Sequence, residues 1–174
     1  SKEPLTVFEP HDAVRGEETA IIQYFLSNEA DSVQAEIYDS KGNLVVSIVG
    51  DSIAQKPTEI HPWYRTRTTG PPTTAKGLNR WEWNLRYPGA TMFERIIIWS
   101  GRPQNGPKAP PGKYEARITV NGVTKSKNFE VKMDPRLKGV SERDLKEQFA
   151  NAIRAKLEVT INKKPIEKMF YQSQ

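Results

Sequence analysis

Apolar and polar residues alternate along several short segments of the first 133 residues, and this alternation predicts β-strands. Segments 32–39 and 113–121 each place every second side chain, mostly apolar, on one face. Such a period of two is typical of a sheet that packs on one side and meets water on the other. The same reasoning predicts further strands at 4–8, 18–26, 44–49, 79–86, 95–99 and 123–133.

Two turn signals join these segments into hairpins. Asp39-Ser40-Lys41-Gly42-Asn43 lies between the third and fourth predicted strands, and Asn121-Gly122 separates the last two. Glycine takes the positive φ that tight hairpin turns require, so both pairs are expected to be antiparallel. Seven or eight short strands without alternating long helices favour a β-sandwich over a parallel α/β sheet.

The central segment Asn79–Arg86 carries the largest core residues. Alternation puts Trp81, Trp83 and Leu85 on one face of a strand and Glu82 on the other. A glutamate between two tryptophans resembles a sugar-binding site, but on an alternating strand its side chain faces water. We therefore expect the rings in the core and Glu82 in solvent.

The segment 50–78 interrupts the pattern with Pro, Thr, Gly and Lys residues. It contains two isolated aromatic residues, Trp63 and Tyr64, flanked by Arg65 and Arg67. Connections of this length are uncommon in compact domains and are usually functional or partner-contacting loops. Its role is left open by the sequence.

After residue 135 the apolar period changes from two to about four. Ser141 with Asp144 predicts a helix cap, and a stripe of apolar residues predicts an amphipathic helix to about residue 163. Pro165 interrupts this helix or starts a second one that ends near residue 171. We therefore divide the chain into a sandwich, 1–135, and a helical tail, 136–174. The stripe consists of Leu145, Phe149, Ile153, Leu157 and Ile161.

An exposed apolar stripe needs a surface to cover it. The sandwich, another part of the protein or a second copy of the chain could supply that surface. Self-association through the helix is therefore one expectation.

Composition narrows the class of protein. With 174 residues the chain suits one domain with an appendage, and the absence of cysteine excludes disulfides and thiolate chemistry. The net charge of +5 is spread thinly: residues 1–133 hold 17 Lys and Arg against 15 Asp and Glu. Nucleic-acid binding is not expected from a region with nearly equal numbers of cationic and anionic residues. No segment is long and apolar enough to cross a membrane, and the chain, which starts without Met, is expected to be a fragment or a processed product.

Candidate catalytic chemistry is sparse. His11 and His61 each lie beside a proline, and neither has a partner at metal-ligand or triad spacing. Residues 101–108 resemble a phosphate-binding loop, but Pro107 stands where the motif needs Lys. We predict no catalytic residue, no metal and no cofactor.

Aromatic residues outside the strand cores are the only candidates for a ligand platform, because sugars stack on exposed rings. The strand aromatics, such as Tyr24, Tyr114 and Phe129, are expected to pack in the core. The candidate ligand-binding residues are Trp63, Tyr64, Tyr87 and Trp99.

Several segments together resemble a known family. They are Asp12–Gly16, Glu36–Val45, Gly77–Gly89, Ala109–Tyr114 and Val131–Arg136. In this order they resemble the C-terminal domain that follows a β-propeller of sortilin-type, neuraminidase-like repeats in large exported bacterial proteins, often labelled glycosyl hydrolase. The likeness covers about residues 4–136, and the same turn-strand pattern is similar to the immunoglobulin-like domain of the flagellar hook cap protein.

The resemblance implies an all-β, immunoglobulin-like sandwich of about seven to eight antiparallel strands, with a helical C-terminal appendage. It also implies an exported location, periplasmic, outer-surface or extracellular, and a β-propeller as partner within the parent chain. Chemistry in that family would belong to the propeller, so the hydrolase label transfers to no residue of this chain.

Three hypotheses for function follow. The first is a non-catalytic accessory or interaction domain of an exported bacterial protein. The second is a carbohydrate-binding module that uses the loop aromatics to bind a glycan. The third is a fragment of a polysaccharide-processing hydrolase.

Overall fold

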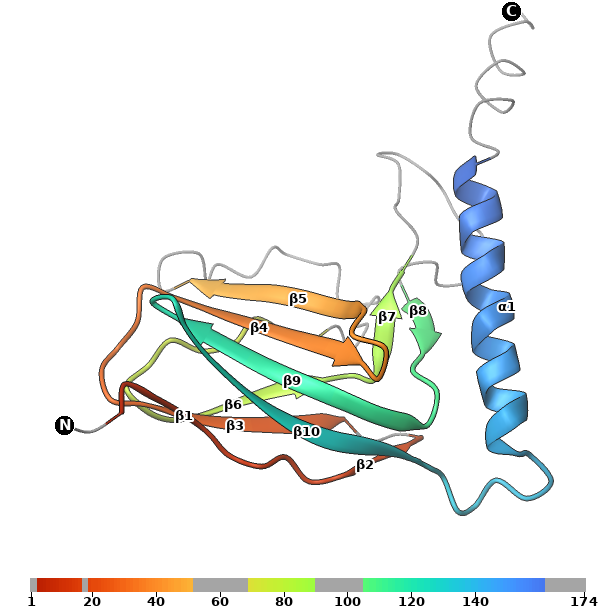
Figure 1. The fold of residues 1–174 in the computed structure, drawn as a ribbon, viewed down its shortest axis with the longest axis horizontal. Helices are drawn as coiled ribbons and strands as arrows, with labels where there is room; N and C mark the ends of the chain where they lie inside the picture. The colour runs from red at the N-terminus through yellow and green to blue at the C-terminus, as the bar shows by residue number, and fades with distance from the viewer. Residues whose placement is uncertain (1–2, 17–18, 52–68, 90–104, 162–174) are drawn as a thin grey trace, which may run out of the picture.

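The computed structural model describes residues 3–16, 19–51, 69–89 and 105–161, and the side chains of the last helix as far as Arg154 (Figure 1). These residues form ten strands and one helix. The strands are β1 (Leu5–Val7), β2 (Ala13–Arg15), β3 (Ala20–Leu26), β4 (Ser32–Asp39), β5 (Leu44–Asp51), β6 (Gly77–Trp83), β7 (Arg86–Pro88), β8 (Asn105–Lys108), β9 (Gly112–Val120) and β10 (Val123–Met133), and the helix is α1 (Glu142–Ile161).

Two sheets pack face to face and enclose one apolar core (Figure 1). The first sheet has the order β1-β3-β6 and the second the order β2-β10-β9-β4-β5, while β7 and β8 form a separate pair. Buried apolar side chains from both sheets form a single cluster. The predicted β-sandwich with a C-terminal helix is confirmed.

One strand pair departs from the antiparallel arrangement. After β1 pairs with β3, the chain continues in the same direction to β2, which joins the other sheet. There β2 runs parallel to the end of β10, with Ala13 beside Val131. The pair is parallel because the chain changes sheets at the buried Pro10 without reversing.

The core faces follow the predicted alternation. Trp81 is 2% exposed and Trp83 is fully buried, whereas Glu82 between them is exposed on the opposite face. The ring of Trp83 lies 5.3 Å from Tyr114 and 6.3 Å from Phe129, measured between ring centroids. Tilted and edge-on ring pairs at these distances are the arrangements that aromatic quadrupoles favour.

The predicted strand 79–86 ends three residues early. A turn at Asn84 and Leu85 separates β6 from β7, and Leu85 has a left-handed φ of 56°. The side-chain oxygen of Asn84 accepts a hydrogen bond from the backbone N–H of Arg86 at 3.1 Å. Leu85 stays buried, so the core pattern survives although the strand does not continue.

An extended segment, Thr69–Ala75, lies beside the sheets, and we call it the strap. Pro71 and Pro72 lack backbone N–H groups, so the strap cannot form a full β-ladder. Side chains of the sheet donate to its carbonyl groups instead: the Trp81 indole N–H bonds Gly70 at 2.8 Å, and the Tyr24 hydroxyl bonds Thr73 at 2.5 Å.

Gly50 in β5 allows the strap to approach closely. A β-carbon at this position would lie 1.8 Å from the carbonyl oxygen of Pro72, far inside van der Waals contact. A side chain of any size is therefore excluded unless the strap moves. The strap belongs to the segment 50–78 that lacks a strand pattern, and residues 52–68 of that segment lie outside the described residues.

Three short strands were not expected from the sequence. They are β2 and β7, each three residues long, and β8, which lies in a turn-rich segment. All three are too short for alternation to be visible, and they form only because a partner strand is present: β10 for β2, while β7 and β8 pair with each other. The expected strand at 95–99 lies outside the described residues.

Helix α1 begins with the predicted cap. The backbone N–H of Asp144 donates to the Ser141 hydroxyl at 3.2 Å, and the Asp144 carboxylate accepts from the Ser141 backbone N–H at 2.8 Å. This reciprocal pair is a capping box. The second predicted helix lies outside the described residues, and the division of the chain at residue 135 stays a prediction.

The helix stands across the end of the sandwich, next to β7 and β8 (Figure 1). Leu145 is buried there, and Phe149 and Ile153 are partly buried. The sandwich thus covers the first part of the predicted apolar stripe. In the part of the chain that the structure describes, no helix is long and apolar enough to span a membrane.

Candidate functional site

Of the four predicted ligand-binding residues, only Tyr87 lies among the described residues. Trp63, Tyr64 and Trp99 lie outside them, so the structure does not show whether the four residues form a common platform. Their assignment stays a prediction.

Tyr87 lies at the contact between β7 and α1. It is partly buried, and its ring lies 4.5 Å from that of Phe149, measured between centroids. Burial, with the nearby negative charge of Asp39, raises the pKa of Tyr87 to about 12. This tyrosine therefore holds the helix on the sandwich, whatever else it contacts.

An apolar groove opens on one side of this contact. Its volume is about 590 Å³. The β4–β5 turn and the segment Pro110–Tyr114 form one wall, while Phe149 and Ile153 belong to the helical wall. Tyr114 also lines the groove; burial raises the pKa of its phenol, and its hydroxyl donates to the Pro110 carbonyl oxygen at 2.8 Å.

A smaller cleft of about 400 Å³ also borders Phe149. It is lined by Arg15 from β2, by Pro107 and Lys108 from β8, and by Gln148, Phe149 and Ala152 from α1. Residues from three elements that are distant in the sequence therefore share one cavity. Neither Arg15 nor Lys108 stands in a sequence pattern that would have marked it as a binding residue.

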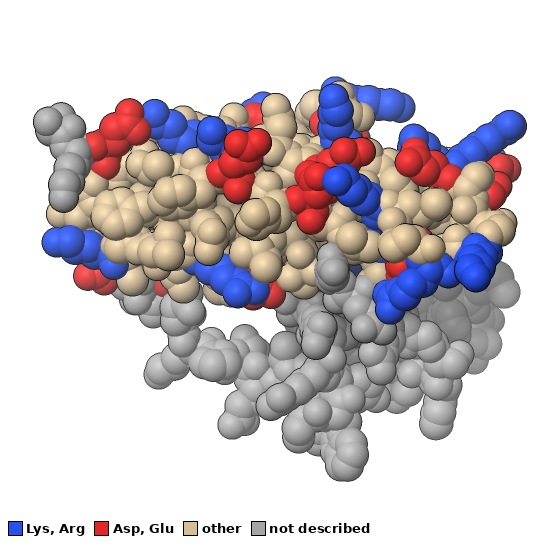
Figure 2. Space-filling model, turned by 90° about the horizontal axis from the view of Figure 1, so that it is seen from below, with Lys and Arg blue, Asp and Glu red and all other residues tan. Residues whose placement is uncertain are grey.

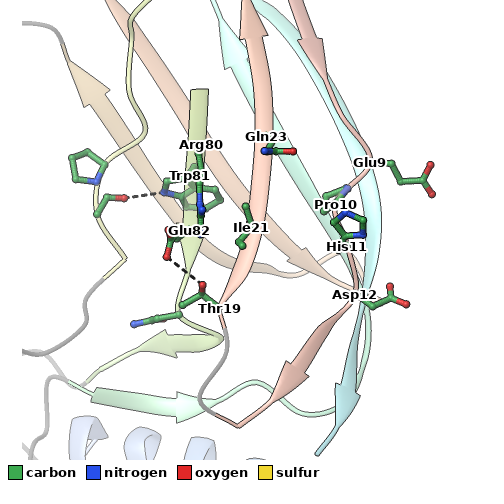
Figure 3. A pocket seen from close by; sticks show the side chains of 13 residues that line it. Glu9, Pro10, His11, Asp12, Thr19, Ile21, Gln23, Arg80, Trp81 and Glu82 are labelled. Carbon is green, nitrogen blue, oxygen red and sulfur yellow. Dashed lines mark hydrogen bonds and ion pairs between the residues drawn. The ribbon is translucent and has the colours of Figure 1, made fainter. Parts of the chain in front are cut away.

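A third depression, of about 900 Å³, lies over the outer face of the three-stranded sheet (Figure 3). Ile21 and Gln23 of β3 and Arg80 and Glu82 of β6 lie along this sheet, and residues 9–12 form one border. Gly70 and Pro71 of the strap line the depression as well.

Glu82 is part of this polar surface and not of the core. Its carboxylate pairs with the Arg80 guanidinium at 2.9 Å and accepts a hydrogen bond from the Thr19 hydroxyl at 3.2 Å (Figure 3). The prediction that it faces solvent is confirmed. His11 is also exposed, and its neighbour Asp12 pairs with Lys132 at 2.7 Å. His61 lies outside the described residues.

The carboxyl groups with shifted pKa values are all held as anions. The Arg117 guanidinium holds the pKa of Glu115 below its usual value, and Arg136 does the same for Asp134. In each case hydrogen bonds to the ionised form outweigh the opposing effect of burial. The carboxyl groups with lowered pKa values are Asp12, Asp39, Glu115, Asp134 and Asp144.

Charges of both signs are interspersed on the face of the molecule that Figure 2 shows. Lys and Arg side chains lie among Asp and Glu side chains along its margins and do not form a continuous basic patch. A phosphate backbone would meet both signs of charge here, which fits the expectation that nucleic acid is not a partner. That expectation stays a prediction.

The topology defines the class of protein: the chain contains an immunoglobulin-like β-sandwich domain. In that fold strands B and E belong to one sheet and C, F and G to the other. Here β3 and β6 share the first sheet, and β4, β9 and β10 share the second.

Comparisons with known proteins do not identify a family for this chain. No protein-family model matches the chain, and no curated protein matches it. Among solved structures the chain is similar to the M1 domain from titin, with 12% sequence identity and a TM-score of 0.35. That alignment covers 79% of this chain and 97% of the titin domain.

Proposed function

We propose that this chain is a non-catalytic interaction domain, an accessory module of an exported bacterial protein. The resemblance to domains that follow a β-propeller suggests that its partner lies in the same parent chain. In this role the sandwich is a rigid support, and its end surface together with α1 provides the contacts.

The proposal rests on the protonation state of the carboxyl groups. A general acid that works near neutral pH needs a raised carboxyl pKa. The carboxyl pKa values that are shifted here are lowered, by partners that also hold turns, caps and strand ends together. Near neutral pH these groups are therefore anions and poor proton donors.

The raised pKa values of two tyrosine hydroxyls also indicate a structural role and not a catalytic one. The hydroxyl groups of Tyr24 and Tyr114 donate hydrogen bonds to the backbone carbonyl oxygens of Thr73 and Pro110. Burial raises the pKa of both hydroxyls, so they remain neutral donors. Their function is to hold the strap and the Pro110–Gly112 turn in place.

Activity assays on the purified full chain test this proposal. We expect no turnover of polysaccharide substrates by the wild-type chain above the rate of a Glu82→Gln variant. Hydrolysis by the wild type that Glu82→Gln or another single carboxyl substitution abolishes would support the hydrolase-fragment hypothesis and overturn the proposal.

Carbohydrate binding is the second candidate function. Beyond the loop aromatics, the depression in Figure 3 favours it, because Gln23, Arg80 and Glu82 present planar polar groups on an open sheet face. Such groups form paired hydrogen bonds with sugar hydroxyls, and Ile21 offers an apolar surface beside them.

A glycan array distinguishes the two candidate carbohydrate sites, the sheet face and the loop aromatics. Binding lost in Arg80→Ala would assign the sugar to the sheet face, and binding lost in Trp63→Ala or Trp99→Ala would assign it to the loop aromatics. No binding across a broad array would count against both.

A further inference from the structure

Positive charge gathers at the end of the sandwich that α1 covers. The Arg15 guanidinium donates from Nε to the Ala109 carbonyl oxygen at 3.0 Å, and Arg86 donates from Nη1 to Gly106 at 2.9 Å. The Lys108 ammonium donates to the carbonyl oxygen of Gly16. Backbone oxygens therefore hold three cations close together.

The three cations differ in the carboxylates that lie near them among the described residues. Asp134 lies close enough to Lys108 for that charge to lower its pKa, although its main partner is Arg136. Within the described ranges, no Asp or Glu forms an ion pair with Arg15 or Arg86. Burial, and then repulsion from Arg86, lower the pKa of Arg15. Two neighbouring, partly buried cations with no acidic partner among the described residues are costly, and a bound anion would relieve that cost.

The guanidinium atoms of Arg15 that do not bond Ala109 have a defined geometry. Its Nε is occupied by Ala109, which leaves the two Nη atoms to donate at the end of the guanidinium. Two parallel N–H groups in one plane match the two oxygens of a carboxylate. Lys108 and the Gln148 amide line the same cleft and can donate further hydrogen bonds.

The remaining walls are apolar. Phe149, Pro107 and Ala152 line the cleft beside the polar groups. An inorganic anion would leave these surfaces uncovered, whereas a carboxylate joined to a ring would cover them. The volume of about 400 Å³ is within the range of small-ligand sites.

We propose that the cleft between β8 and α1 binds the carboxylate of a small ring-bearing acid, with Arg15 and Lys108 as its cationic partners. The ring packs on Phe149 and Pro107. A uronic acid and an aromatic acid share this chemistry. The cleft lies on the same end surface, but the proposal does not depend on the interaction role proposed above.

Titration of the full chain by NMR tests the site, with probes in matched pairs. Benzoate and neutral benzamide differ only in the charged end, and so do glucuronate and glucose. One charge-assisted bidentate contact makes the charged member bind at least about tenfold more tightly. Binding of glucuronate alone identifies a sugar acid, and binding of benzoate alone identifies an aromatic acid. Equal affinity for the two members of each pair, or sulfate binding as tightly as either acid, overturns the proposal.

Two substitutions locate the binding. Arg15→Gln removes the guanidinium and should reduce acid affinity at least about tenfold, whereas Arg117→Gln, at a residue that pairs with Glu115 and does not line the cleft, should leave it unchanged. If Arg15→Gln fails to fold, Gln148→Glu replaces it as the decisive variant. This exposed helix position would place a carboxylate in the cleft itself.

We expect Gln148→Glu to abolish acid binding and to raise the melting temperature, because the new carboxylate neutralises the cations. Asn151→Asp adds the same charge on an exposed part of α1 that does not line the cleft, so it should do neither. Unchanged acid binding in Gln148→Glu, or an equal rise in melting temperature in both variants, contradicts the assignment.

Discussion

Two segments outside the main sheets close the sandwich, and they do so by different interactions. The strap is fixed by directional hydrogen bonds from buried side chains and by a close approach to Gly50. Helix α1 is held by apolar contacts of Leu145, Phe149 and Ile153. Directional bonds to a backbone fix one position, whereas ring contacts tolerate small shifts. The strap is therefore fixed against the sheets at defined positions, whereas the helix is attached mainly by apolar contacts and borders two cavities.

The largest expected effect is at the strap. Gly50→Ala would place a methyl group 1.8 Å from the Pro72 carbonyl oxygen, so the strap must move. We expect a loss of about 3 kcal/mol in the free energy of unfolding, measured in urea. Gly70→Ala is the matched control, because a β-carbon there meets nothing within 4 Å. Equal effects of the two substitutions would show that the strap does not lie against β5.

A smaller loss is expected when the strap loses one hydrogen bond. Trp81→Phe keeps an aromatic ring in the core but removes the indole N–H that bonds Gly70. Loss of this bond together with the smaller ring should cost about 2 kcal/mol. Tyr24→Phe removes only the hydroxyl that bonds Thr73, so it should cost about 1 kcal/mol. A Tyr24→Phe variant less stable than Trp81→Phe would contradict this ranking.

The helix should respond differently from the strap. Phe149→Ala removes the ring that packs on Tyr87, at a cost of about 1 to 2 kcal/mol. Because the sandwich core does not include this residue, hydrogen exchange should quicken in α1 while β3 and β6 keep their protection. Equal loss of protection in the helix and the sheets would mean that the two parts unfold as one unit.

The cap gives a still more local effect. Ser141→Ala removes the hydroxyl that accepts from Asp144, which should cost about 1 kcal/mol in the first turn of α1. Ser141→Thr retains the hydroxyl and should restore most of this stability. Backbone amide exchange at residues 142–145 reports the difference, and equal exchange in both variants would exclude a role for the cap.

Alkaline pH should affect both segments, with little effect near neutrality. Burial raises the pKa of Tyr24 and Tyr87 above the ordinary value of 10, and that of Tyr87 reaches about 12. Their stabilising contribution is complete below pH 10 and is lost as the pH rises through the folded pKa. Stability should therefore fall above pH 10, and less steeply in Tyr87→Phe. An unchanged slope in that variant would show that Tyr87 titrates normally.

The sequence predicted the parts of the fold that depend on local patterns. Alternation alone placed Trp81 and Trp83 in the core and Glu82 in solvent, and the spacing of Ser141 and Asp144 marked the start of α1. The long strands of both sheets, β3, β4, β5, β6, β9 and β10, lie where alternation predicted strands. Each of these features follows from residues within one or two turns of one another.

The candidate sites were less predictable. The loop aromatics were selected because exposed rings bind sugars, yet Tyr87 proved to pack against a helix residue 62 positions away in the chain. The cationic cleft carried no sequence signal, since Arg15 bonds a carbonyl group 94 residues away. Periodicity within a segment cannot reveal such contacts.

By itself, the sequence determined the class of fold, the faces of the long strands, the hairpins and the helix cap, because those features are set by local sterics and by burial of every second side chain. Only the tertiary structure decided where the strap lies, which short segments become β2 and β8, and which cations share a cleft. Those features depend on contacts between distant segments, which form when both sheets and the helix are already in place.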